Sequence, residues 1–300
     1  MLISRKKNKN ICSICKNMDK DQISCGVVLS PWIREMANIN DSLSNYRSCN
    51  NCNIGYFTRR YSNYEMNLIY KDYRGTKYFE TRNKWEKWYD KEFFTNESSS
   101  SFALERKLMI KNFIVSKINY KIETVLDVGG DKGQYIPDFE STTKRYVVDP
   151  SNRELAHGVK RLNSLEDIEK CDLILYSHVL EHVSFPLQDI MNLLRKCKAL
   201  YIEVPFGKPR INLARRLGIF VPLILILSKF PKIYSKFTSP TAGRLKNRNL
   251  WLNQSEHINF FEENSFRFIA EINNKNLQYI VSEIPTPDGK KAKVIQALFQ

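Results

Sequence analysis

The chain has 300 residues, 42% of them hydrophobic, which is enough for one large domain with a smaller module beside it. Its longest apolar run, residues 217–227, contains Pro222 and falls well short of the ~20 residues that a membrane-spanning helix needs. Residues 1–10 are basic and lack the apolar segment of a signal peptide. We therefore expect a cytoplasmic protein, with attachment to the inner face of the membrane as the alternative. Seven cysteines in that compartment favour thiols or metal ligands over a disulfide framework.

The net charge of +15 suits an anionic partner. The positive residues are spread along the chain, apart from clusters at 208–216 and 244–248. This distribution differs from the basic stripe that is typical of nucleic-acid-binding domains, so we do not favour a nucleic-acid partner. An anionic sugar nucleotide and an anionic membrane surface would use the same charge.

The N-terminal part of the chain contains two C-x-x-C pairs, and each pair can place two thiolates on one tetrahedral zinc ion. The four candidate ligands are Cys12, Cys15, Cys49 and Cys52. Cys25 lies between the pairs as a competing ligand. No histidine is near either pair, which favours a structural zinc over a catalytic one. We predict a small zinc-binding module over residues 1–75.

Residues 76–121 are expected to form an aromatic-rich helical linker. Three rings within 84–94, at positions i, i+3 and i+4, predict a helix there, and a second helix is predicted over 102–117. We interpret most of these rings as the interface between the zinc module and the main domain. A minority would cover a substrate.

Residues 122–300 predict a doubly wound α/β sheet. The apolar run at 124–128 is followed by a glycine turn, in which small residues let backbone N–H groups approach a ligand. A second apolar run ends at Asp149, 22 residues after Asp127, where an acid can bind two ribose hydroxyls. The first strand and its turn supply Asp127, Gly129, Gly130 and Gly133.

Two further apolar runs, at 171–177 and 199–205, predict strands, and the motif H-V-L-E-H-V at 178–183 directly follows the first of them. This order of elements resembles that of the class I S-adenosylmethionine (SAM)-dependent methyltransferases. There, D-x-G-G-x-x-G, V-D-P-S and D-L-I-x-x-x-H-V-L-E-H-V are the corresponding motifs. Asp131 stands where that family usually has glycine. Its carboxylate would meet the ammonium group of the cofactor or weaken its binding.

The resemblance implies a Rossmann-like sheet that ends in an antiparallel hairpin, and a set of cofactor contacts. It places Ser164 and Leu165 near the adenine of SAM, and His178 or His182 near the transferred methyl group. The implied SAM-binding residues are Asp127, Gly129, Gly130, Gly133, Asp149, Ser164, Leu165 and Ser177.

The residues His178, Glu181 and His182 also spell H-x-x-E-H, the inverted zinc-protease motif. On a helix, both histidines would share one face and could bind zinc, which would make the protein a hydrolase. The motif follows a buried strand directly, however, and a protease would leave the glycine turn without a purpose. A second alternative to a catalytic role is that one histidine caps a helix or is a polar core residue.

Residues 254–261 resemble the Y-x-E-H-x-x-x-F motif of sugar methyltransferases that combine a four-cysteine zinc module with a class I domain. The match implies that Glu256, His257 and His182 are acid/base residues. Gln254 replaces the tyrosine, and the further C-terminal domain of the C-methyltransferases does not follow in this sequence. We therefore favour O- or N-methylation of a sugar nucleotide or surface glycan over C-methylation. Nucleic-acid methylation and a non-catalytic zinc-plus-Rossmann binding module are the alternatives.

Residues 206–252 follow the strand predicted at 199–205, at the carboxyl edge of the sheet. We predict an insertion that covers the ligand crevice as a lid. Its apolar stretch at 219–227 is flanked by basic residues, so a segment that touches anionic lipid is the alternative. A helix at 263–273 and a hairpin at 278–299 then complete the domain.

Overall fold

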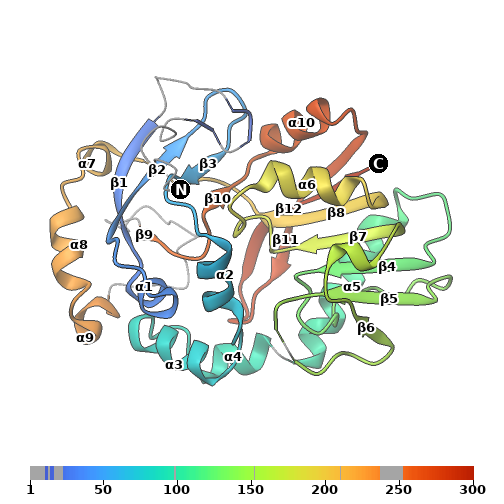
Figure 1. Cartoon of the computed structure of the whole chain (residues 1–300), viewed down its shortest axis with the longest axis horizontal. Helices are drawn as coiled ribbons and strands as arrows, with labels where there is room; N and C mark the ends of the chain where they lie inside the picture. The colour runs from blue at the N-terminus through green and yellow to red at the C-terminus, as the bar shows by residue number, and fades with distance from the viewer. Residues whose placement is uncertain are drawn as a thin grey trace, which may run out of the picture.

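The computed structural model describes residues 11–12, 14–16, 23–97, 99–151, 153–209, 211–236 and 253–300. The basic cluster predicted at 244–248 and the second half of the predicted lid lie outside these residues. The described strands form a seven-stranded sheet and a five-stranded sheet. Figure 1 shows the two sheets side by side, with α2 (Asn63–Tyr70) between them.

The seven-stranded sheet has the predicted Rossmann-like α/β form, with strand order β11-β12-β8-β7-β4-β5-β6. Strands β4 to β8 run parallel to one another, and β12 pairs antiparallel with β8 and with β11. The C-terminal pair is the predicted antiparallel hairpin. The strands are β4 (Thr124–Val128), β5 (Lys144–Val148), β6 (Val159–Arg161), β7 (Cys171–Ser177), β8 (Cys197–Pro205), β11 (Leu277–Pro285) and β12 (Lys291–Phe299).

Helices cover both faces of this sheet, which explains why its central strands are apolar throughout. On one face, Leu126 and Ile174 share a core with α6 (Pro186–Leu194) and α10 (Glu263–Ile272). On the other face, Val125 and Leu173 pack with α5 (Ser100–Val115). Adjacent residues of one strand therefore enter opposite cores, and the carboxyl ends of the parallel strands remain available for a ligand.

The five-stranded sheet joins segments from distant parts of the sequence, in the order β10-β3-β2-β1-β9. Strands β1, β2 and β3 lie in the predicted N-terminal module, but β9 and β10 come from the part assigned to the methyltransferase domain. Residues 253–260 therefore complete the N-terminal sheet, a pairing that no local sequence pattern predicts. The strands are β1 (Ile23–Leu29), β2 (Leu43–Ser48), β3 (Gly55–Phe57), β9 (Asn253–Gln254) and β10 (Asn259–Phe260).

The continuous helix predicted over 84–94 is wrong. The N-terminal sheet is accompanied by α1 (Pro31–Ala37), α3 (Thr76–Trp85) and α4 (Lys91–Glu97), and residues 86–90 interrupt the predicted helix. The guanidinium of Arg82 lies over the rings of Trp88 and Tyr89, at 5.1 and 4.4 Å from their centroids. The chain thus bends so that aromatic rings surround a buried cation instead of sharing one helix face.

Three short helices follow β8: α7 (Leu213–Arg216), α8 (Val221–Leu227) and α9 (Pro231–Tyr234). α7 and α8 contact β1, and α9 contacts α3. Figure 1 shows them, in orange, along the outer edge of the five-stranded sheet. Among the described residues, no helix combines the length and the apolar character needed to cross a bilayer.

Candidate functional site

A cavity of about 670 Å³ opens at the carboxyl ends of β4, β5 and β7. This volume lies within the range of small-molecule sites, roughly 300–1,000 Å³. Its other walls come from α2, from the aromatic segment around Trp88 and Tyr89, from the loop that carries Glu256 and His257, and from the β11–β12 hairpin. Elements of both halves of the chain thus enclose one site.

The glycine turn after β4 lies on the cavity wall, as predicted. Gly129 has φ +73°, a left-handed conformation that glycine adopts readily. A Cβ on Gly130 would lie only 2.2 Å from Cγ of Asp127, so no larger residue fits there. Burial, together with the charges of Asp149 and Asp131, raises the pKa of the Asp127 carboxyl to about 7. Gly133 closes the turn but is not part of the cavity wall.

Asp149 lines the cavity at the end of β5 and is held by backbone groups. Its two carboxylate oxygens accept hydrogen bonds from the N–H groups of Asp131, at 2.9 Å, and Ser151, at 2.7 Å. These bonds fix the carboxylate while each oxygen keeps a lone pair for a further donor. The geometry suits the predicted contact with ribose hydroxyls.

Asp131, the departure from the family's glycine, binds two arginines. The residue has φ +54°, a conformation that aspartate tolerates better than most residues. Its Oδ2 lies 2.9 Å from Nη1 of Arg153 and 3.3 Å from Nη1 of Arg74, and its Oδ1 accepts a hydrogen bond from Ser151 Oγ at 3.1 Å. Its negative charge is therefore compensated within the chain, and it links the cofactor turn to the segment between α2 and α3.

The helix that the zinc-protease alternative would need over the H-x-x-E-H motif does not form, because residues 178–183 make a turn directly after β7. His178 has φ +55°, and its Nδ1 and Nε2 lie 3.2 Å from Glu181 Oε1 and 3.0 Å from Glu203 Oε1. Burial alone would lower the pKa of His178, but the two carboxylates outweigh it and raise the pKa to about 9. His178 is therefore a cation at neutral pH and is unsuited to act as a base.

We expect a titration of the His178 ring followed by NMR, with the signal assigned through His178→Gln, to show a pKa near 9. The stabilising effect of this ion pair is then fully present below the ordinary histidine pKa of 6.5 and is lost as the pH rises through about 9. A titration at or below 6.5 would contradict the pairing.

His182 and His257 meet in the cavity, with ring centroids 4.7 Å apart. Nδ1 of His182 lies 2.9 Å from the Tyr70 hydroxyl and 3.2 Å from the backbone oxygen of Glu256. Burial and the nearby His182 lower the pKa of His257 to about 4, so this ring is neutral at pH 7. His257 is therefore a neutral nitrogen base in the cavity, and the His182 ring lies against it.

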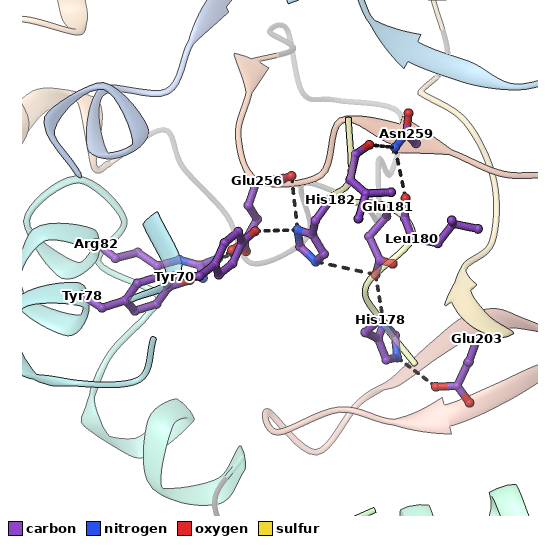
Figure 2. A network of polar contacts seen from close by, with 11 residues as sticks. Tyr70, Tyr78, Arg82, His178, Leu180, Glu181, His182, Glu203, Glu256 and Asn259 are labelled. Atoms are coloured by element: carbon purple, nitrogen blue, oxygen red, sulfur yellow. Dashed lines mark hydrogen bonds and ion pairs between the residues drawn. The ribbon is translucent and has the colours of Figure 1, made fainter. Parts of the chain in front are cut away.

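Glu256 does not orient the His257 ring, although the two residues are neighbours in sequence. Its carboxylate lies 2.8 Å from Nη2 of Arg82 and accepts a hydrogen bond from the Tyr78 hydroxyl at 3.0 Å (Figure 2). Burial would raise the pKa of Glu256, but Arg82 outweighs it and lowers the pKa to about 2. Glu256 is thus a permanent anion that ties its loop to α3.

The sequence prediction missed Arg82, Tyr70 and Glu203. The i, i+4 spacing of Tyr78, Arg82 and Glu86 on a helix was the available signal for Arg82. Glu203 lies within an apolar strand. An acidic residue at such a position needs a buried cation beside it, and this was the available signal for the ion pair. In the structure Glu203 pairs with Arg106 and His178, and they lower its pKa to about 2 against the effect of burial.

Arg60 and Asn259 join the turn at 178–183 to the N-terminal half. The side-chain amide of Asn259 donates to the backbone oxygens of Leu180 and Val183, at 3.0 and 2.8 Å. Arg60 donates to Asn259 Oδ1 at 2.7 Å and to the Val183 oxygen at 2.8 Å. The histidine turn is therefore held against the strand that follows His257.

The remaining predicted cofactor contacts divide into two groups. Ser177 lines the cavity, and its buried Oγ has no hydrogen-bond partner among the described residues, as expected of an atom that a ligand satisfies. Ser164 instead caps a short 3₁₀ turn, Leu165–Asp167, by accepting a hydrogen bond from the Glu166 N–H. Neither Ser164 nor Leu165 is part of the described cavity wall.

The four cysteines of the two C-x-x-C pairs come together, with all four sulfurs within 4.8 Å of one another. Cys12 and Cys52 are 3.5 Å apart between sulfurs, as are Cys15 and Cys49. Tetrahedral Zn–S bonds of about 2.3 Å place sulfurs roughly 3.8 Å apart, so the cluster fits zinc. Cys25 lies in β1, outside this cluster.

A second group of potential metal ligands is formed by Glu181, His182 and His257, whose donor atoms also lie within 4.8 Å. The Oε2 atom of Glu181 is buried and has no hydrogen-bond partner among the described residues.

The part of the predicted lid that the structure describes does not line the cavity. This part comprises residues 206–209 and 211–236. The inner side of this segment packs on β1 and α3, in the apolar core of the five-stranded sheet.

The fold, the glycine turn and the acid after β5 define a SAM-dependent methyltransferase. The chain belongs to the methyltransferase domain family, whose model matches residues 79–278. A comparison with curated proteins found no match.

Solved structures similar to the chain include three bacterial proteins. The first is a magnesium protoporphyrin IX methyltransferase with bound SAH from Synechocystis PCC 6803, at 14% identity and TM-score 0.39, covering 70% of this chain and 86% of that one. The second is a SAM-dependent methyltransferase from Aquifex aeolicus, at 17% identity and TM-score 0.39, covering 70% and 97%. The third is a cyclopropane-fatty-acyl-phospholipid synthase-like protein from Lactobacillus casei, at 11% identity and TM-score 0.41, covering 70% and 94%.

Proposed function

We propose that this methyltransferase acts on an oxygen or nitrogen atom of a carbohydrate, and that a sugar nucleotide is its acceptor. The observation that carries the proposal is a basic pocket of about 390 Å³ beside the main cavity. The two share Arg74, Asp131 and Gln134. The cations of this basic pocket are Arg74, Lys107, Lys132 and Arg153.

Asp131 pairs with Arg74 and Arg153, and Asp138 pairs with Lys107 at 3.5 Å. Four cations against these two carboxylates leave a positive charge that suits a diphosphate, which carries several negative charges. The main cavity offers complementary surfaces for the rest of such a molecule. Tyr73, Trp88 and Tyr89 present aromatic rings there, on which a sugar or base can stack. A neutral glycan would leave the basic pocket without a partner.

The site residues can prepare a hydroxyl acceptor for transfer. When bound, SAM supplies an electrophilic methyl group. A hydroxyl is a poor nucleophile until a base accepts its proton. His257, which is neutral at pH 7, and the adjacent His182 are placed to accept that proton at a ring nitrogen. Tyr70 orients His182, while Arg82 and Glu256 hold the loop that carries His257.

The test is methyl transfer from labelled SAM to nucleotide sugars, neutral glycans and RNA. We expect the labelled methyl group to appear in nucleotide sugars. The KM for the acceptor should rise roughly tenfold or more in Lys132→Gln, since a charge-assisted contact contributes about 1.5–3 kcal/mol. Lys170→Gln is the control, because Lys170 precedes β7 at the opposite end of the strand from the cavity. Labelling of RNA alone, or of neutral glycans with equal KM in both variants, would overturn the proposal.

We infer that the cysteine cluster holds one structural zinc ion. Purified protein is expected to contain about one zinc per chain, and Cys52→Ser to lose it and to unfold at lower temperature, because metal binding is coupled to folding. Cys25→Ser is the matched control, since this buried cysteine lies outside the cluster and should retain the metal.

Elemental analysis gives the number of zinc ions. Protein without zinc would contradict the structural site. Two zinc ions per chain would assign the second to Glu181, His182 and His257, and would remove these histidines as bases.

A further inference from the structure

The segment from α7 to α9 has a buried inner side and an apolar outer side. On the inner side, Ile224 and Tyr234 are buried in the core of the five-stranded sheet. The outer side exposes large apolar side chains to about half or more of their area. These are Leu213 (70%), Leu217 (66%), Ile219 (58%), Leu223 (50%), Ile226 (57%), Phe230 (51%) and Ile233 (45%). We call these seven side chains the α7–α9 face.

Single exposed apolar residues are normal, but seven within one short segment mark an interaction surface. The rest of the described chain does not cover this face. Figure 1 places α7, α8 and α9 at the outer edge of the molecule, beyond β1 and away from the seven-stranded sheet. A partner could reach them without obstructing the cavity, whose described walls include no residue of this segment.

The charge around the α7–α9 face has a single sign. The sequence contains no aspartate or glutamate between residues 204 and 255. Within the same segment, the cations Arg216, Lys229, Lys232 and Lys236 are exposed beside the apolar side chains. The face therefore combines aliphatic area with positive charge that no acidic residue of the same segment offsets.

Apolar area together with positive charge favours one of three possible partners for the α7–α9 face. A second copy of the chain would bring two positive surfaces together, and like-charge contacts oppose association. A nucleic acid would match the cations but leave the aliphatic side chains facing phosphates. An anionic bilayer satisfies both, because apolar side chains enter the boundary of the acyl chains while lysines and arginines meet lipid phosphates.

We propose that the α7–α9 face docks the enzyme on an anionic phospholipid bilayer. The helices are too short to span it, so the segment lies in the plane of the interface. This inference is independent of the acceptor, because it rests on residues that are not in the active site.

The test is co-sedimentation of the full-length protein with vesicles of phosphatidylcholine alone, or of equal parts phosphatidylcholine and phosphatidylglycerol. We expect binding to the second and little to the first. Each cation near the surface contributes about 1 kcal/mol, so Lys229→Gln with Lys232→Gln should weaken binding by roughly 30-fold. Leu217→Asp with Ile226→Asp should remove sedimentation.

Leu43→Asp with Leu108→Asp is the matched control, since these side chains are 53% and 50% exposed but lie on β2 and α5. SAM binding by each variant shows that it has folded. The proposal is overturned if the parent stays in solution with anionic vesicles, or if the α7–α9 variants bind like the control. A dimer in light scattering that Leu217→Asp dissociates would instead assign the face to a second copy.

Discussion

Replacement of Gly129 by valine is expected to abolish SAM binding. A side chain at this position meets two obstacles. The φ of +73° is unfavourable for an L-residue by about 1–2 kcal/mol. The added Cβ would also lie 2.5 Å from Cγ2 of Val179, within the turn that carries the histidines. Relief of this clash requires the glycine turn to move, which removes the close backbone approach that the cofactor needs.

Gly158→Val is the control that separates the effect of backbone strain from the effect of a steric clash. Gly158 has almost the same backbone conformation, φ +75°, but a Cβ there has no atom within 4 Å. We expect this variant to unfold at a lower temperature while its affinity for SAM, measured by calorimetry, stays close to that of the parent. Equal SAM affinity in Gly129→Val and Gly158→Val would show that the cofactor binds elsewhere.

His257→Ala is expected to lower turnover by roughly 10²–10⁴, the usual contribution of general acid–base catalysis, and His182→Ala to do the same. Neither residue belongs to the glycine turn or to the Asp149 site, so the affinity for SAM should change little. His157→Ala is the control, because that histidine is exposed and lies outside the cavity wall.

The pH profile provides a second readout for the same prediction. Because the pKa of His257 is lowered to about 4, its ring keeps the basic form through the neutral range. The decrease in the parent's kcat/KM that protonation of His257 causes should therefore occur only as the pH drops towards 4. Near-normal turnover in both His257→Ala and His182→Ala would contradict the histidine-base mechanism. The rate enhancement would then come from the alignment of SAM and acceptor alone.

The sequence predicted the parts of the fold that depend on local pattern. Apolar runs that end at Asp127, Asp149 and Ser177 became the parallel strands of the large sheet, because a strand buried on both faces must be apolar throughout. The C-terminal hairpin followed from two such runs around a turn. Two C-x-x-C pairs brought the four cysteines together despite the long segment between them.

Long-range pairing escaped prediction. Strands β9 and β10 are two residues long, too short for any periodicity, and their partners lie about two hundred residues earlier in the chain. The contact of Arg82 with Glu256 escaped prediction for the same reason, because the two residues are far apart in the sequence. The lid was predicted from the place of residues 206–252 in the sequence order, but the apolar surface of β1 determined where the described part packs.

The roles of the acidic residues were the least predictable part of the site. The motif implied an acid/base role for Glu256, yet Arg82 in α3 attracts its carboxylate and makes it a permanent anion. His178 stands at the expected place, but Glu203, from the neighbouring strand, makes it a cation. In both cases the partner that decides the pKa comes from another element of the fold.

The pairing of β9 and β10 has a consequence for how the chain can be divided. His257 lies in the loop between these two strands, so the proposed base is mounted on the sheet that begins at residue 23. A fragment that begins at β4 would still possess the glycine turn and Asp149. It would lack the strands β1 and β3, against which the flanks of that loop are fastened. We therefore expect such a fragment to keep the residues that we propose for SAM binding and to lose the support of the proposed base.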